Sequence, residues 1–186
     1  MNRYLAAVLI LSAPAGAAAQ TIDPTPGRLE IVGQAPSACL IRTPTGEAAV
    51  NATFESTGSS SGQIRITEFV DPGSAQSRGA SMDLVVPVIC NSPHRVTVRS
   101  GNGGLRRLGS PVPAGPFIEF LPYQVNAVWG GSQGGIASDS GGPLLIDSPS
   151  ARAGQLSLSF DIARGGRPLV AGTYSDSIVI ELQAAN

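Results

Sequence analysis

Two cysteines and one histidine are the residues of this chain most able to bind a metal ion or to carry out redox chemistry. They are Cys39, Cys90 and His94. A structural zinc site normally uses four protein ligands and a catalytic site three, and two cysteines are too few for a site built on thiolates. In an oxidising compartment an even number of cysteines normally pairs. The sequence therefore predicts one disulfide, between Cys39 and Cys90, with no metal and no cofactor.

A serine nucleophile is the second chemical possibility. The segment SDSGGPL at residues 138–144 resembles the segment around the nucleophile of chymotrypsin-like serine proteases, in which the first position is usually glycine. Ser140 would need a histidine as base and a carboxylate to orient that histidine. The sole histidine, His94, lies in SPHR rather than AAHC, and Glu119 is the only acid between it and Asp139. The triad is incomplete, so we expect no enzyme activity and interpret His94 as a surface residue.

The N-terminus has the three parts of a cleavable secretory signal. An arginine supplies positive charge, Leu5–Leu11 form a short apolar stretch, and small residues lead to three alanines at 17–19. Alanine at both positions read by a signal peptidase predicts cleavage before Gln20, with cleavage before Ala18 as the alternative. We expect residues 1–19 to be a signal peptide and the mature chain to be secreted.

Composition limits the partners of the mature chain, residues 20–186, whose length suits one domain. The mature chain contains no lysine, and acidic residues outnumber arginines by two. It therefore lacks the basic face that binds nucleic-acid phosphates. It also has no segment near the roughly 18 consecutive apolar residues of a membrane-spanning helix. We expect no nucleic-acid partner and no membrane span in the mature chain.

Short apolar or alternating segments recur between clusters of Gly, Pro, Ser and Asn, a pattern typical of antiparallel β-sandwiches and barrels. The fold class is therefore predicted to be all-β. The expected strands are Arg28–Val32, Cys39–Arg42, Ala48–Phe54, Gln63–Phe69, Asp83–Cys90, Arg95–Ser100, Phe117–Trp129, Gln155–Ile162 and Tyr174–Gln183. The last alternates most clearly, with Ile178, Ile180 and Leu182 on the face that we expect to be buried.

Other positions receive structural interpretations. The stretches Gly101–Gly104 and Gly130–Gly142 lack the strand-to-helix context of phosphate-binding glycines, and we interpret them as flexible loops. Asn51 begins a glycosylation sequon, but its segment is predicted to be a strand. Trp129 is predicted to lie in the core, with exposure for binding as the alternative. Tyr174 is predicted at the core edge with its hydroxyl group in solvent.

A series of motifs runs through most of the mature chain. The motifs are Cys39 after a short N-terminal strand, VIC at 88–90, RVTV at 95–98, GNGG at 101–104, RRL at 106–108, LPYQV at 121–125, VWG at 128–130 and AGTYSDSIVI at 171–180. In this order they resemble the spore coat protein U family, which includes the secreted subunits of Csu-type (archaic) chaperone-usher pili. The order and the C-terminal strand together carry the resemblance.

The resemblance implies an immunoglobulin-like β-sandwich that lacks its final strand and has a hydrophobic groove along an open edge. In this family a periplasmic chaperone first fills the groove, because an unpaired apolar edge invites aggregation. The N-terminal extension of the next subunit then replaces the chaperone, with an outer-membrane usher as the assembly platform. This exchange is β-augmentation. By this resemblance the acceptor groove lies beside Ile178, Ile180 and Leu182.

The extension at residues 20–38 can be tested against this role from its own pattern. Leu29, Ile31 and Gly33 share one face of a strand, which suits a short donor strand. The alternative is that Arg28–Val32 is the first strand of its own domain, which would make the protein a self-complemented monomer.

The predicted organisation is a signal peptide, the donor extension and a spore coat U-like domain at residues 39–186. We predict a non-enzymatic structural subunit of a cell-surface pilus or fimbria that is secreted through the periplasm. Its expected partners are neighbouring pilus subunits, a periplasmic chaperone and an outer-membrane usher. The sequence leaves open whether it is a shaft, minor or tip subunit. A stand-alone secreted β-sandwich adhesin, or a spore or cell-coat protein, is the alternative.

Overall fold

The computed structural model describes residues 29–112 and 114–184, and within them the chain is all-β with no helix. The predicted signal peptide at residues 1–19 and the start of the extension lie outside the described residues. The strands are β1 (Cys39–Ile41), β2 (Thr45–Val50), β3 (Ala52–Gly58), β4 (Ser61–Ile66), β5 (Ser77–Cys90), β6 (His94–Ser100), β7 (Leu105–Arg107), β8 (Phe120–Leu121), β9 (Gln124–Trp129), β10 (Ser132–Ala137), β11 (Leu144–Ser148), β12 (Arg152–Gly165), β13 (Tyr174–Ser175) and β14 (Ile178–Ala184).

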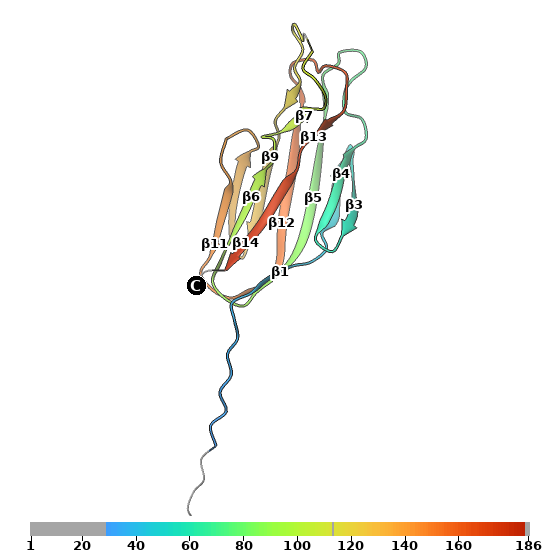
Figure 1. The fold of residues 1–186 in the computed structure, drawn as a ribbon. Helices are drawn as coiled ribbons and strands as arrows, with labels where there is room; N and C mark the ends of the chain where they lie inside the picture. Colours follow the sequence, from blue (N-terminus) through green and yellow to red (C-terminus); the bar gives the residue numbers. More distant parts are fainter. Residues whose placement is uncertain (1–28, 113, 185–186) are drawn as a thin grey trace, which may run out of the picture. The chain divides into compact units, whose positions relative to one another are not determined.

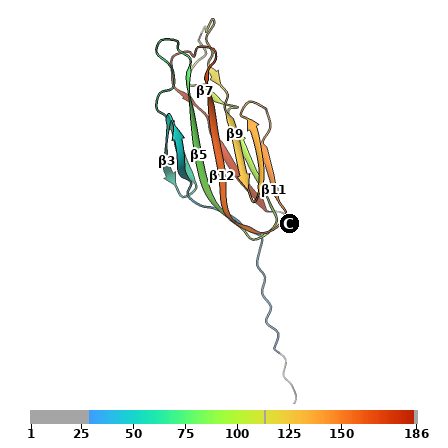
Figure 2. The ribbon, with the colours of Figure 1, turned by 180° about the vertical axis from the view of Figure 1, so that it is seen from behind.

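The larger layer is a six-stranded antiparallel sheet built around the two longest strands. β5 and β12 pair along almost their whole length, and the order across the sheet is β1-β5-β12-β9-β10. β2 joins the same edge of β5 as β1, further along the strand. Figures 1 and 2 show the long β5–β12 pair from the two sides of the domain. This pair supplies a rigid support for the opposite layer.

The smaller layer is a three-stranded antiparallel sheet in the order β11-β6-β14. Alternating residues of both layers form one core, in which Val86, Leu156 and Trp129 of the larger sheet and Val96 and Val98 of the smaller sheet are almost fully buried. This period-two burial matches the side-chain alternation of strands. The protein is therefore a β-sandwich, as the sequence predicts.

Two smaller pieces of sheet complete the domain. β3 and β4 form a hairpin, and β13, β7 and β8 form a three-stranded ribbon. The Phe54 side chain of β3 packs directly on the backbone of Gly46 and Gly62. A Cβ atom added at Gly46 or Gly62 would lie 2.9 or 2.3 Å from that side chain, so a larger residue would not fit at either position without a shift. These pieces extend the edges of the sandwich without adding a second core.

Most of the predicted strands are confirmed, and the differences have local causes. The segment Ala48–Phe54 is two strands, because Asn51 has φ 55° and turns the chain between β2 and β3. Asparagine tolerates this left-handed conformation better than most residues. Phe117–Trp129 is likewise divided into β8 and β9.

The interpretation of Gly130–Gly142 as a flexible loop was wrong. Positive φ values at Gly130 and Gly131 make the tight turn that leads into β10, which pairs with β9 from Ser132 to Ala137. β11 follows after a second turn and was not predicted. Glycine can adopt such turn conformations without a Cβ penalty, and here the glycines build a hairpin instead of a mobile loop.

No helix among the described residues has the length and apolar character needed to cross a membrane.

Candidate functional site

The two outer strands of the smaller sheet differ in how well the core covers them. Two rows of apolar residues cross the sheet, each drawn from β11, β6 and β14. The rows are Leu144, Val98 and Ile180, and Ile146, Val96 and Leu182. Leu144 and Ile146 are 8% and 4% exposed, whereas Ile180 and Leu182 are only half-buried. The core is therefore closed at the β11 end of each row and partly open at the β14 end.

Ile178, Ile180 and Leu182, which we call the β14 strip, lie on one face of the strand and pack against the core. The sequence prediction that these three residues share a face toward the core is thus met, with incomplete burial. Other half-buried apolar residues near this flank are Cys39 and Ile41 of β1, the strand that lies closest to β14 across the sandwich. Further apolar contact area is therefore available along the β14 edge.

The backbone of β14 also has an unpaired edge, since β14 is the last strand of its sheet as described. The amide of Gly101 donates a hydrogen bond to the carbonyl oxygen of Ser177 at 2.7 Å, so Ser177 turns its backbone groups toward β6. Backbone groups alternate in direction along a strand. The N–H and C=O groups of the β14 strip therefore face the unpaired edge, while the side chains of the same residues face the core.

The predicted donor residues lie in an extended and exposed segment. Leu29 and Ile31 are 87% and 90% exposed, and a Cβ added at Gly33 would meet nothing within 4 Å. Residues 29–38 form no strand, so the strand predicted at Arg28–Val32, whose first residue lies outside the described residues, is not formed. Leu29 and Ile31, together with Val32 on the other face, which is 78% exposed, are thus available for burial against another surface.

Asn91 fixes the point at which the chain enters the sandwich. Its side-chain Nδ2 donates to the carbonyl oxygen of Pro36 at 2.8 Å, and its Oδ1 accepts from the amide of Ala38 at 2.7 Å. The amide of Asn91 completes the set by donating to the carbonyl oxygen of Ala38 at 3.1 Å. We call this arrangement the Asn91 clamp.

The predicted disulfide is confirmed. Cys39 and Cys90 are register partners of β1 and β5, with their Cα atoms 4.1 Å apart and their sulfur atoms bonded. The ring of His94 lies nearby, with ligand-type atoms of all three residues within 4.8 Å of one another. Both sulfur atoms are already in the disulfide, and both ring nitrogens of His94 have hydrogen-bond partners. These atoms are therefore already engaged in bonds within the protein.

The interpretation of His94 as a surface residue was wrong, because the side chain is only 3% exposed. Its Nε2 lies 2.9 Å from Nε1 of Trp129, and its Nδ1 lies 2.9 Å from the carbonyl oxygen of Ser92. A polar ring can be buried at modest cost when both nitrogens are hydrogen-bonded in this way. Trp129 is 2% exposed and lies in the core, as predicted.

The serine motif is not brought to the histidine. Across the β11–β6 pair, Ser148 is the partner of His94 and Leu144 is the partner of Val98. Ser140 precedes Leu144 and therefore lies beyond the far end of this strand pair from His94. Since both ring nitrogens of His94 are also engaged, the described residues place no histidine base beside Ser140.

A second polar cluster surrounds Asp176, just before β14. The carboxylate accepts hydrogen bonds from the hydroxyl of Tyr123 at 2.7 Å, the hydroxyl of Ser100, and the amides of Asn102 and Ser177 at 2.8 and 2.7 Å. Burial, followed by the hydrogen bond to Asp176, raises the pKa of Tyr123 well above its ordinary value. The cluster joins the start of β14 to the end of β6 and to the segment before β9. Sequence reasoning missed it because its members are distant in the chain.

The hydroxyl of Tyr174 does not point into solvent, which corrects the prediction for this residue. It lies 2.8 Å from the carbonyl oxygen of Val170 and 3.1 Å from that of Ile118. Burial raises the pKa of Tyr174 as well. Its ring packs against Phe69 with a centroid distance of 5.1 Å. Tyr174 therefore has a structural role at the edge of the sandwich.

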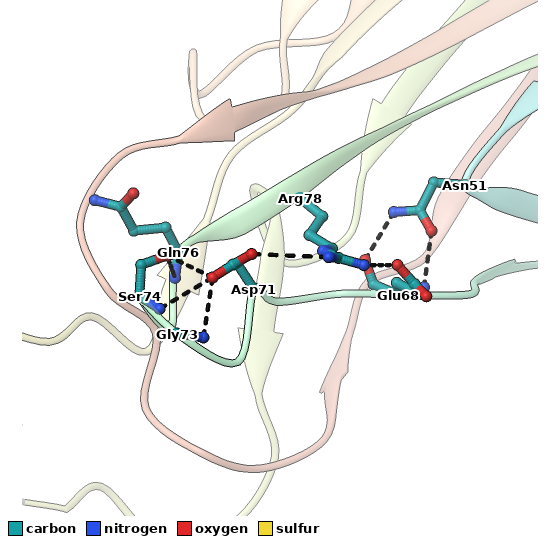
Figure 3. Close-up of polar contacts among 7 residues, drawn as sticks. All are labelled: Asn51, Glu68, Asp71, Gly73, Ser74, Gln76 and Arg78. Atoms are coloured by element: carbon teal, nitrogen blue, oxygen red, sulfur yellow. Dashed lines mark hydrogen bonds and ion pairs between the residues drawn. The ribbon is translucent and has the colours of Figure 1, made fainter.

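Figure 3 shows a third polar cluster, around the turn between β4 and β5. Asn51 donates from Nδ2 to the carbonyl oxygens of Glu68 and Gly79, both at 2.7 Å, and its Oδ1 accepts from the amide of Glu68 at 2.8 Å. Arg78 pairs with the carboxylate of Glu68 and lies 3.8 Å from that of Asp71. The side-chain amide of Asn51, the sequon residue, is thus fully used in holding the β2–β3 turn against β5.

No protein-family model, curated protein or solved structure matches this chain. The geometry of the described residues, together with the motif resemblance, is therefore the basis for the proposals on function.

Proposed function

We propose that this chain is a secreted structural subunit of a surface pilus or fimbria. It polymerises by donating Leu29, Ile31 and Gly33 to the open β14 edge of a neighbouring copy. The observation that carries the proposal is the β14 strip, whose apolar side chains are half-buried while the backbone groups of the same residues face an unpaired edge. An added strand would cover the side chains and bond the backbone at the same time.

The donor segment has the period that such a site requires. Alternate residues of a strand lie roughly 7 Å apart on one face, so Leu29 and Ile31 have the same spacing as Ile178 and Ile180. Both donor side chains are almost fully exposed in the free chain. Burying a side chain of this size contributes about 1.5–3 kcal/mol, and the new main-chain hydrogen bonds would add specificity for an extended segment.

The route of assembly follows from the resemblance to the spore coat protein U family. A periplasmic chaperone would cover the β14 strip until the next subunit arrives, and an outer-membrane usher would be the platform on which the exchange occurs. Protection is needed because an exposed apolar strand edge pairs readily with other chains. The sandwich is then a structural part without catalysis.

The test uses a deletion of the donor segment and two aspartate substitutions on its opposite faces. We expect deletion of residues 20–34 to leave the disulfide-bonded domain folded and to abolish the ladder of oligomers seen after export with a co-expressed chaperone and usher. Ile31→Asp should have the same effect, because it places a charge in the apolar site. Val32→Asp, on the other face, should leave the ladder intact.

A ladder that persists undiminished after the deletion would refute donor-strand assembly. Purification of the whole chain as a soluble monomer without any chaperone would instead support the stand-alone adhesin. The contact between β1 and β14 favours this second candidate, because β1 packs against part of the β14 flank within the same chain.

A further inference from the structure

The chain contains one Asn-Gly step, Asn102–Gly103, in the turn between β6 and β7. Asparagine followed by glycine is especially prone to deamidation, because glycine has no Cβ atom to hinder attack by its own amide nitrogen. Asn102 is exposed, and a Cβ atom added at Gly103 would meet nothing closer than 3.7 Å. The sequence and the local space therefore both allow the side chain of Asn102 to react with the backbone of Gly103.

The side chain of Asn102 is also held less firmly than two other asparagines of the described chain. Its Nδ2 lies 3.5 Å from the carbonyl oxygen of Ser175, which is longer than an ordinary hydrogen bond. Asn51 and Asn91 instead donate from Nδ2 at 2.7 and 2.8 Å and accept at Oδ1 at 2.8 and 2.7 Å. The N–H of Gly103 forms no hydrogen bond among the described residues. Neither reacting group is therefore fixed by a short hydrogen bond.

The reaction needs only water. The amide nitrogen of Gly103 bonds to Cγ of Asn102, the Cγ–Nδ2 bond breaks, and the proton from Gly103 leaves with the side-chain nitrogen as ammonia. A succinimide ring remains. Water then adds to one of its carbonyl groups and breaks that carbon–nitrogen bond. Opening at Cγ gives aspartate, whereas opening at the former backbone carbonyl gives isoaspartate, in which the main chain runs through Cβ and Cγ.

An isoaspartate would not fit this turn without a shift. The backbone N–H of Asn102 donates to Oδ1 of Asp176 at 2.8 Å, which fixes the chain before the reacting bond. After that bond, Gly104 is buried, and an added Cβ would lie 2.8 Å from Phe120 and 2.9 Å from the carbonyl oxygen of Leu121. Isoaspartate adds one methylene group to the main chain between these two fixed points, so one of them must give way.

We propose that Asn102–Gly103 is a site of spontaneous deamidation, and that its isoaspartate product releases the backbone of residue 102 from Asp176. The contact with Asp176 is a single hydrogen bond at an exposed residue, whereas Gly104 is buried, so the contact with Asp176 gives way first. The Asp176 cluster then loses one of its donors at the start of β14. The proposal concerns the folded domain and does not depend on donor-strand assembly.

Ageing of the purified, monomeric chain in mildly alkaline buffer tests the reaction. Peptide mapping by mass spectrometry should show that Asn102 is converted to a mixture of aspartate and isoaspartate, while Asn51 and Asn91 keep their amides. Conversion should be slower in mildly acidic buffer, because the nitrogen of Gly103 must lose its proton. Asn102→Gln is the matched variant, since it keeps a side-chain amide but would have to close a larger ring, and it should not be converted over the same period.

Urea unfolding of the fresh and the aged chain tests the structural consequence. We expect the unfolding equilibrium constant of the isoaspartate form to be about tenfold larger, because a hydrogen bond to a charged carboxylate is lost. The aged Asn102→Gln variant should change by less than about twofold, because it keeps that hydrogen bond. Asn102→Asp supplies the new charge without lengthening the main chain, and its constant should be only about threefold larger than that of the wild type.

The site and its consequence can be refuted separately. The site is wrong if Asn102 keeps its amide or is converted no faster than Asn51 and Asn91. The consequence is wrong if the fully converted chain unfolds with a constant within about twofold of that of the fresh chain. It is also wrong if Asn102→Asp destabilises the domain as much as ageing does. Fresh and aged wild-type chains carry the main comparison even where a variant folds poorly.

Discussion

Each flank of the sandwich ends on an outer strand of the smaller sheet, β11 at one flank and β14 at the other, and the larger sheet covers the two strands differently. At one flank, β10 and β11 follow each other in the chain, belong to different sheets and contact each other, so the connection between the two layers closes the core. At the other flank, β14 ends the smaller sheet and faces the short strand β1. Val96 and Val98 of β6 therefore lie between buried residues of β11 on one side and half-buried residues of β14 on the other.

This difference separates the strand that is covered by its own domain from the strand at which we propose assembly. Leu144 and Ile146 of β11 are buried in the core of the single chain. The β14 strip is only half-buried, and among the described residues no strand pairs with its outer edge, so the proposed partner strand could use both. A sandwich closed equally at both flanks would not offer that site.

Truncation at the two ends of one cross-strand row gives the largest expected contrast. Ile146→Ala on β11 should lower the free energy of unfolding of the monomer by about 3 kcal/mol, because it opens a cavity in a closed core. Leu182→Ala on β14 should cost only about 1 kcal/mol, because its side chain is only partly buried. Urea denaturation of the two variants measures both values, and equal losses would contradict the difference between the flanks.

The Asp176 cluster holds the start of β14 against the end of β6 and the segment before β9, and its removal should have the next largest effect. Asp176→Ala leaves the buried hydroxyl of Tyr123 without its acceptor and should lower the free energy of unfolding by about 2 kcal/mol. Asp139→Ala removes an exposed acid and serves as the control, with an expected change within about 0.5 kcal/mol. Chemical denaturation at pH 7 distinguishes the two variants. A result in which they cost the same would mean that the cluster does not hold the start of β14.

The smallest expected effect is a loss of stability in alkali. Because the pKa of Tyr123 is raised in the folded chain, its phenol keeps its proton where the unfolded chain loses one, near about pH 10. The stabilisation is complete below that pH and falls as the pH rises above it, by about 1 kcal/mol between pH 10 and 11. Phenolate absorbance measures the ionisation of the tyrosines, and denaturation midpoints at several pH values measure the loss of stability. Tyr123→Phe should show a shallower decline, and an unchanged decline would assign the effect to another group.

Much of the sandwich could be predicted because its strands follow strict alternation. In β12, Leu156, Leu158 and Phe160 alternate with polar residues and burial follows that pattern, and in β14 the alternate residues Ile178, Ile180 and Leu182 pack against the core. β10 was missed because its SQGG sequence has the composition of a loop, although its pairing with β9 makes it a strand. Pairing between strands is a tertiary property that local composition does not contain.

The polar contacts were harder to predict for the same reason. His94 lies in a polar stretch of sequence, and its burial depends in part on a hydrogen bond with Trp129, which is 35 residues away in the chain. The Asp176 cluster also depends on residues more than 50 positions apart. The disulfide could be predicted because the chain has only two cysteines, so no choice of partner arises.

The Asn91 clamp has a mechanical consequence. Only two residues separate Gly33 from Pro36, the first residue that the clamp holds, and a fully extended step from one to the other spans roughly 10 Å. A strand inserted up to Gly33 in a neighbouring sandwich would therefore leave a very short tether. Successive domains in a fibre joined in this way would be closely spaced, and bending between them would be restricted by the length of the tether.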